Sequence, residues 1–177
     1  MYIQENAVWY AMRAIFHKEM EVKKLLDREN IENFIPMRYS LATKNGRKVR
    51  LLIPAVANLI FVHATPMALK EVKKKNGYLQ YIVNSRNKEK IIVPDEQMKR
   101  FIFVASSYSE KLIYLKPEEV NLKEGTLVRI IGGVFDGVEG LFIRIKGARS
   151  RRVVVLIREV TAVATAEIEP DLIEVIL

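Results

Sequence analysis

The chain has 177 residues, of which 29 are Lys or Arg, 21 are Asp or Glu and none is Cys, so its formal net charge is +8. Half of the residues are apolar, a composition typical of a folded protein rather than of a disordered tail. The absence of cysteine excludes a disulfide framework, a thiolate zinc site and a cysteine nucleophile, and two histidines are too few for a histidine-rich metal centre. The N-terminal residues lack the pattern of a secretory signal, and no apolar run is long enough to cross a bilayer, so a cytoplasmic protein is expected.

The positive charge is concentrated in the first part of the chain. Residues 1–107 carry 19 Lys or Arg against 10 Asp or Glu (net +9), residues 108–120 carry 2 against 3 (net −1), and residues 121–177 carry 8 against 8 (net zero). This asymmetry predicts two modules with different partners. The basic module is the candidate for nucleic-acid binding, because neutralising phosphates releases counterions. The alternative is a soluble domain that is basic without a nucleic-acid partner.

The first 64 residues are expected to alternate between strands and helices. β-Branched and aromatic residues predict strands over 8–16, 33–42, 48–53 and 58–63. Between the first two strands, Val22, Leu25 and Leu26, together with Met20, lie on one face of a helix predicted over 18–29. The dipeptide Asn45-Gly46 predicts a tight hairpin turn, because both residues readily adopt positive φ angles.

A second helix is predicted from Thr65-Pro66 to Lys75, since Thr caps helices and Pro suits the first helical position. Short strands follow over 79–84 and 90–93, and a third helix begins at Pro94-Asp95. Its apolar face is expected to contain Met98, Phe101, Ile102 and Ala105. The order β-α-β-β-β-α-β-β-α predicts an α+β sandwich in which helices pack on an antiparallel sheet.

The remaining residues predict a linker and a second, all-β module. Residues 108–122 are expected to be the linker, between a first domain over 1–107 and a second over 123–177. Short strands are predicted over 126–131, 140–146, 152–157, 161–168 and 171–176. Five short strands in so few residues are typical of a small SH3-like barrel.

The second module contains a glycine-rich pattern that resembles the KOW motif. Gly125 precedes the first strand, and Gly133, Phe135, Gly137 and Gly140 follow it in a Gly-x-Phe-x-Gly-x-x-Gly turn. The glycines after the strand allow positive φ angles or a close backbone approach, and the aromatic ring anchors the loop. Three spaced glycines alone are weak evidence, whereas glycines between two strands are a stronger signal.

The first module is similar to the NusG N-terminal (NGN) domain over roughly residues 7–106. The pattern consists of Trp9-Tyr10 on the first strand, Phe34-Ile35-Pro36 after the helix, a basic hairpin, and Pro54 followed by residues 58–62, Asn-Leu-Ile-Phe-Val. Together the two modules resemble the NusG family of transcription elongation factors over nearly the whole chain. Within that family the chain looks most like the UpxY/RfaH-type specialised antiterminators, although Ala57 and Leu59 stand where the family usually has Pro and Tyr.

The resemblance implies a non-enzymatic, cofactor-free factor that binds RNA polymerase and reduces pausing or termination, here of a polysaccharide-type operon. The protein is expected to be a monomer and to have no membrane partner.

In the family the NGN domain binds the clamp helices of RNA polymerase through an apolar pocket. The matching positions are Trp9, Tyr10, Arg13, Leu59 and Phe61. Arg13 is the strongest candidate, because a charged side chain in an apolar strand needs a partner, while Trp9 and Phe61 can also be plain core residues.

A second implied surface is cationic and faces non-template DNA or nascent RNA. No acidic residue occurs from Asn33 to Lys70, and the basic residues gather around the hairpin turn and on the second helix. The alternative is that these charges form only a solvated face. The candidates are His17, Lys18, Lys44, Arg47, Lys48, Arg50, Lys70, Lys73, Lys74 and Lys75.

The neutral second module is expected to bind a protein. By resemblance its partner is the termination factor Rho or a small-subunit ribosomal protein. Alternatively, Arg149, Arg151 and Arg152 contact RNA, and the chain is an RNA-binding or ribosome-associated KOW protein without a polymerase role. A nuclease is the third hypothesis, but the sequence has no phosphate-binding glycine loop, metal-ligand cluster or catalytic triad.

Overall fold

The computed structural model describes residues 6–120, 125–146, 149–168 and 170–176. The chain divides into two compact units, Met1–Asp95 and Glu96–Leu177, a division that lies before the expected linker. Every strand pairing among the described residues is antiparallel, and the helices are few. The predicted mixed α+β class with antiparallel sheets is therefore confirmed.

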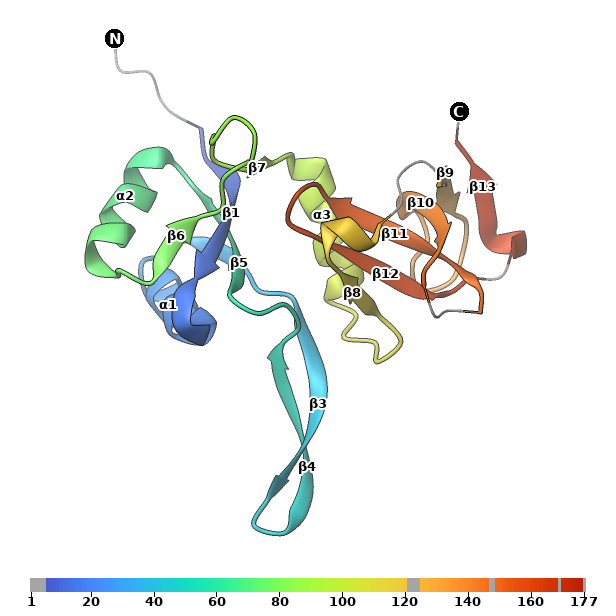
Figure 1. The fold of residues 1–177 in the computed structure, drawn as a ribbon, viewed down its shortest axis with the longest axis horizontal. Coiled ribbons are helices and arrows are strands. Elements are labelled where there is room, and N and C mark those ends of the chain that lie inside the picture. Colours follow the sequence, from blue (N-terminus) through green and yellow to red (C-terminus); the bar gives the residue numbers. More distant parts are fainter. Residues whose placement is uncertain (1–5, 121–124, 147–148, 169, 177) are drawn as a thin grey trace. The chain divides into compact units, whose positions relative to one another are not determined.

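The first unit is built on a five-stranded sheet in the order β2-β5-β1-β6, with β7 also paired to β1 (Figure 1). Its strands are β1 (Val8–Ala14), β2 (Glu32–Phe34), β5 (Leu59–Ala64), β6 (Leu79–Tyr81) and β7 (Ile92–Val93). Helices α1 (Glu19–Arg28) and α2 (Pro66–Lys75) bury one apolar face each, through Val22 and Leu26 and through Leu69 and Val72. The buried residues of each helix are three or four positions apart, so they form one apolar face that packs in the core of the unit.

The helix ends follow the sequence closely. Thr65 Oγ1 accepts the Ala68 backbone N–H at 3.2 Å, and Pro66 occupies the first turn, as predicted for α2. For α1, the expectation that Met20 belongs to the buried face is wrong, since its side chain is 43% exposed. The buried side chain at this helix start is Glu19, whose carboxylate accepts the Asn58 backbone N–H.

The strand predicted over 33–42 is interrupted at Pro36, which has no N–H to donate to a sheet. Its second part, β3 (Met37–Lys44), leaves the five-stranded sheet and pairs along its whole length with β4 (Arg47–Pro54). Asn45 and Gly46 connect the two strands with φ angles of 51° and 73°, so the predicted turn is confirmed. Figure 1 shows this β3–β4 hairpin as a two-stranded ribbon that extends away from the sheet.

The second unit contains a six-stranded sheet in the order β13-β9-β10-β11-β12-β8. Its strands are β8 (Ile113–Leu115), β9 (Thr126–Ile130), β10 (Glu139–Arg144), β11 (Arg151–Ile157), β12 (Thr161–Glu167) and β13 (Ile173–Val175). Strand β8 lies inside the expected linker and pairs with β12. Its three residues are too few to show a strand period, so the sequence does not predict this strand.

Helix α3 (Asp95–Ala105), expected in the first module, falls almost wholly in the second unit. Gln97 Nε2 donates to the Leu156 carbonyl at 2.5 Å, and Arg100 Nη2 lies 2.6 Å from Glu139 Oε2. Both contacts join α3 to the six-stranded sheet.

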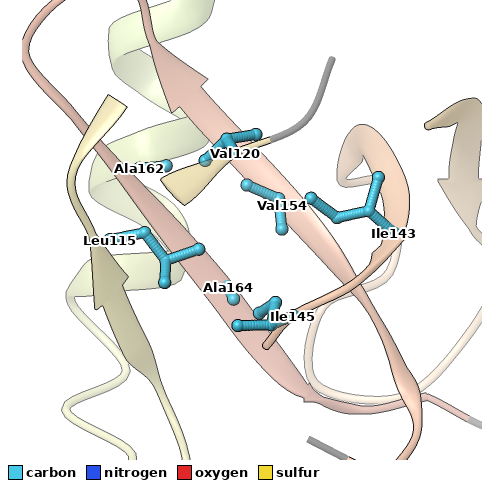
Figure 2. Close-up of a cluster of buried hydrophobic side chains, with 7 residues drawn as sticks. All are labelled: Leu115, Val120, Ile143, Ile145, Val154, Ala162 and Ala164. Carbon is cyan, nitrogen blue, oxygen red and sulfur yellow. The ribbon is translucent and has the colours of Figure 1, made fainter. Parts of the chain in front are cut away.

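One buried cluster combines side chains from β8, from the segment after it and from the chain between β10 and β12 (Figure 2). It consists of Leu115, Val120, Ile143, Ile145, Val154, Ala162 and Ala164. Leu115 and Val120 come from the expected linker, so part of that segment supplies core to the second unit.

Candidate functional site

Four of the five predicted polymerase-binding residues lie on one face of the five-stranded sheet. Arg13 lies opposite Leu59, and Ala11 lies opposite Phe61, in the register of β1 with β5. Opposed residues share a face and alternate residues return to it, so Trp9, Arg13, Leu59 and Phe61 all lie on this side, which we call the Arg13 face. Tyr10 lies on the other side, where its ring meets that of Tyr81 edge-on at 5.6 Å.

Burial separates the members of the Arg13 face. Phe61, Leu59 and Trp9 are buried, as core residues are, whereas Arg13 is exposed. Side chains that are already buried cannot be reached by a partner, whereas an exposed arginine is among the side chains most often found as interface anchors. Of the predicted set, Arg13 is therefore the residue that can contact a partner directly.

A row of three side chains that the sequence does not predict continues along the Arg13 face. The rings of Trp9 and His63 stack at 5.0 Å with an interplanar angle of 19°, and His63 Nδ1 lies 2.8 Å from Glu32 Oε2. The register of β2, β5 and β1 places the three side chains in one row. Only that register brings them together, and residues 31 positions apart give no sequence signal for it.

The predicted cationic residues of the β3–β4 hairpin are all exposed and cluster at its end. In the register of β3 with β4, Lys44 lies opposite Arg47, Thr43 opposite Lys48, and Leu41 opposite Arg50. The Arg50 guanidinium lies 3.8 Å from the centre of the Tyr39 ring, an arrangement that fixes both side chains. The hairpin also exposes apolar side chains, notably Leu41 at 73%, which a solvated charged face would not require.

The segment before α1 holds His17 and Lys18 in an unusual backbone conformation. Phe16 and His17 have φ angles of 60° and 56°, a left-handed conformation that costs non-glycine residues about 1 kcal/mol or more each. The His17 N–H donates to Asn58 Oδ1 at 2.9 Å. Phe16 is 74% exposed, so the segment presents an aromatic ring together with His17 at the surface.

Lys18 is less available than its position suggests. Its ammonium lies 2.9 Å from Glu21 Oε2 and 5.5 Å from the centre of the Tyr78 ring. The hydrogen bond with Glu21 raises the pKa of Lys18 above its ordinary value. Its charge is therefore partly neutralised within the unit.

The four predicted lysines of α2 differ in their surroundings. Lys74 lies 2.7 Å from Glu71 Oε1, and the hydrogen bond lowers the pKa of that carboxyl. Lys75 lies 2.8 Å from Glu29 Oε1 of α1. Lys70 is exposed and Lys73 is half-buried. Two of the four charges are thus compensated by carboxylates, so the helix is not a uniform cationic stripe.

The glycine-rich turn of the second unit joins β9 to β10. Gly133 and Gly137 have φ angles of 72° and 79°, which favour glycine, and the Gly137 N–H donates to the Ile130 carbonyl at 2.8 Å. Phe135 is buried beneath the turn. Gly125 and Gly140 lie at close approaches instead: a Cβ on Gly140 would lie 2.6 Å from the Val154 carbonyl oxygen. The turn thus has a defined backbone that depends on its small residues.

The arginines proposed for RNA contact are partly used inside the second unit. Arg152 Nη1 donates to the Thr165 and Lys111 carbonyls at 2.7 and 3.0 Å. The Arg151 guanidinium lies 5.9 Å from the centre of the Phe142 ring. Arg149 is exposed. The structural role of Arg152 weakens the case for an RNA site here.

Within the described ranges no group of three or more His, Asp or Glu side chains is placed to hold a metal ion. No helix in that same part of the chain combines the length and apolarity needed to span a membrane.

Comparison with known proteins identifies the family. A family model described as transcription termination factor NusG matches residues 7–102. A solved structure titled "Domain interaction in Thermotoga maritima NusG" is similar with a TM-score of 0.49 and 23% sequence identity, over 97% of this chain and 98% of that one. Comparison with curated proteins finds no match. Because the family model spans more than half of the chain, this protein belongs to the NusG family.

Proposed function

We propose that this protein is a transcription elongation and antitermination factor that binds the clamp helices of RNA polymerase through the Arg13 face and reduces pausing or termination. NusG-family proteins are transcription factors that bind RNA polymerase and are not enzymes. The observation that carries the proposal is the exposed Arg13 among the buried Trp9, Leu59 and Phe61. An exposed guanidinium suits a partner that offers a carboxylate at the contact.

The charge of the β3–β4 hairpin supports the proposal that the protein lies beside nucleic acid during elongation. Its exposed Lys44, Arg47, Lys48 and Arg50 have no acidic residue near them in sequence, and they extend away from the sheet that carries the Arg13 face (Figure 1). A projecting cationic ribbon can reach a phosphate backbone while the sheet stays docked on a protein. In this proposal the protein is a specialised UpxY/RfaH-type factor for a polysaccharide-type operon.

The second unit is proposed to fold as a KOW SH3-like barrel and to bind a protein, either Rho or a small-subunit ribosomal protein. Residues 96–177 carry 12 Lys or Arg and 12 Asp or Glu, so the unit has no net charge to attract nucleic acid. Arg129, for example, lies 2.7 Å from Glu139 Oε1 and 3.5 Å from Glu174 Oε2.

The test replaces Arg13 with alanine and measures affinity for an isolated clamp-helix fragment of RNA polymerase by isothermal titration calorimetry. Losing an arginine anchor at an interface costs about 2 kcal/mol, which predicts roughly a thirtyfold weaker Kd. The matched control is Lys74→Ala, which removes a cation from α2. Helix α2 lies on the side of the sheet opposite Arg13, because its Lys73 reaches the Tyr81 ring on that side. Lys74 is therefore away from the Arg13 face. Equal affinity of wild type and a folded Arg13→Ala protein would contradict the assignment.

A further inference from the structure

Two lysine ammonium groups share one tyrosine ring on the face of the sheet opposite Arg13. Lys73 Nζ of α2 and Lys90 Nζ each lie 4.2 Å from the centre of the Tyr81 ring. The two ammonium groups are therefore at most 8.4 Å apart, twice that distance. Like charges so close together repel each other unless an anion lies between or beside them.

The backbone brings the segments that carry these three residues close together. Lys90 forms a β-bridge with Val83, which makes it a diagonal cross-strand neighbour of Tyr81. The loop between them is closed by Asn84, whose Oδ1 accepts the N–H groups of Arg86 and Asn87 at 2.8 and 3.3 Å. Lys73 reaches the same ring from α2, so three separate segments meet at Tyr81.

The nearby carboxylates are used elsewhere. Glu71 binds Lys74, and Glu29 binds Lys75. Glu89, next to Lys90 in the chain, accepts the side-chain amide of Asn87 at 2.6 Å. Across the described residues, no carboxylate forms an ion pair with Lys73 or Lys90. Burial and, secondarily, the charge of Lys90 lower the pKa of Lys73, which is the mark of an uncompensated cation.

We propose that Lys73, Lys90 and Tyr81 form a specific site for the phosphodiester backbone of a nucleic acid. The inference deepens the proposed function, because it rests on the N-terminal unit working beside nucleic acid, and it adds Lys90 and Tyr81 to that surface. Exposed Lys70, Arg86 and Lys88 lie on the same two segments as Lys73 and Lys90. Several cations on two segments that meet at Tyr81 suit a polyanion with several phosphates, rather than a single carboxylate.

The experiment compares two charge-matched double variants of the full chain. Lys73→Gln with Lys90→Gln removes both cations of the site, whereas Lys74→Gln with Lys75→Gln removes two cations that carboxylates already neutralise. Binding of a fluorescein-labelled single-stranded DNA oligonucleotide is measured by fluorescence anisotropy over a range of salt concentrations. For two lost phosphate contacts, the slope of log K against log salt falls by about 1.4 in the first variant and stays unchanged in the second.

The outcomes decide between the site and its alternatives. Weaker binding with a reduced slope only in the Lys73/Lys90 variant supports the site, and Lys73→Arg with Lys90→Arg should restore it. Equal losses in both variants would mean that only total charge matters, and no binding by wild type would remove the nucleic-acid site altogether. Full competition by inorganic phosphate, or tighter binding of polyglutamate, would assign the site to a free anion or to an acidic protein.

The same variants are measured against the clamp-helix fragment. Unchanged clamp affinity together with lost oligonucleotide binding separates this site from polymerase docking. Conversely, a wild-type protein that binds the oligonucleotide but not the clamp helices would contradict the proposed function and leave the phosphate site standing.

Discussion

Tyr114 shows how a single residue of the expected linker became part of the folded second unit. It lies on β8, opposite Val163 of β12, and its hydroxyl is buried without a hydrogen-bond partner in the described structure. Burial raises the pKa of Tyr114 to about 12, with a smaller contribution from Tyr108. A buried hydroxyl without a partner costs free energy. Tyr114 therefore stabilises the unit through the packing of its ring and not through its hydroxyl.

We predict that Tyr114→Phe reduces the loss of stability at alkaline pH. In the unfolded chain tyrosine ionises near pH 10, whereas the folded residue resists ionisation until about pH 12. The folded pKa is the higher one, so stability is full below pH 10 and falls as the pH rises towards 12. Urea unfolding at pH 8, 10 and 11.5 should show a smaller decline for Tyr114→Phe than for wild type. Tyr39→Phe, which changes an exposed ring on the hairpin, should decline as wild type does.

At neutral pH the phenylalanine variant should be as stable as wild type or more stable by up to about 1 kcal/mol, since it removes an unsatisfied polar atom. A strong destabilisation at pH 8 would indicate that the hydroxyl has a partner and would refute this account.

At the level of elements, the sequence predicted the features that depend on neighbouring residues. The Asn45-Gly46 turn and the Thr65-Pro66 helix start are local, and both were found. Features that depend on register were not predicted: the Trp9–His63–Glu32 row, and the approach of Lys90 to Tyr81. The same limit explains β8, whose three residues form a strand only because β12 offers an edge to pair with.

The glycine-rich pattern combines a local and a tertiary requirement for glycine. Gly137 is needed for its positive φ angle, whereas Gly140 is needed because another strand comes close. A Cβ on Gly140 would lie 2.6 Å from the Val154 carbonyl oxygen and 2.9 Å from Val153 Cγ1. We predict that Gly140→Ala pushes β10 away from β11 and lowers the free energy of unfolding by about 2 kcal/mol, as overpacking usually does. Urea unfolding monitored by circular dichroism provides the measurement.

The control is Gly77→Ala, at a glycine where an added Cβ meets nothing within 4 Å and φ is not positive. This variant should unfold at nearly the wild-type urea concentration. If both alanine variants behave alike, the close approach of β10 and β11 is not what requires glycine at position 140.

At the level of the whole molecule, the two units differ in net charge. Residues 1–95 carry 17 Lys or Arg and 9 Asp or Glu, a net of +8, whereas residues 96–177 are neutral. The entire excess of the chain therefore belongs to the unit that contains the hairpin and the Lys73–Lys90 pair. Composition alone predicted two modules of different charge, but the boundary needed the structure, because α3 and β8 join the second unit.

This separation predicts that salt affects the two proposed activities differently. Charge reversal at Arg47, Lys48 and Arg50 should weaken binding to a transcription elongation complex and reduce its salt slope by about 2 to 3, because each lost phosphate contact removes roughly 0.7 to 0.9. Native gel shifts over a range of potassium concentrations measure this slope. Affinity for the isolated clamp helices should stay at the wild-type value, because the exposed hairpin lies outside the Arg13 face. A matched reversal of Lys23, Lys24 and Arg28 on α1 changes the net charge equally and should leave the slope unaltered. If both reversals lower the slope equally, the hairpin acts through the charge of the unit and makes no phosphate contacts of its own.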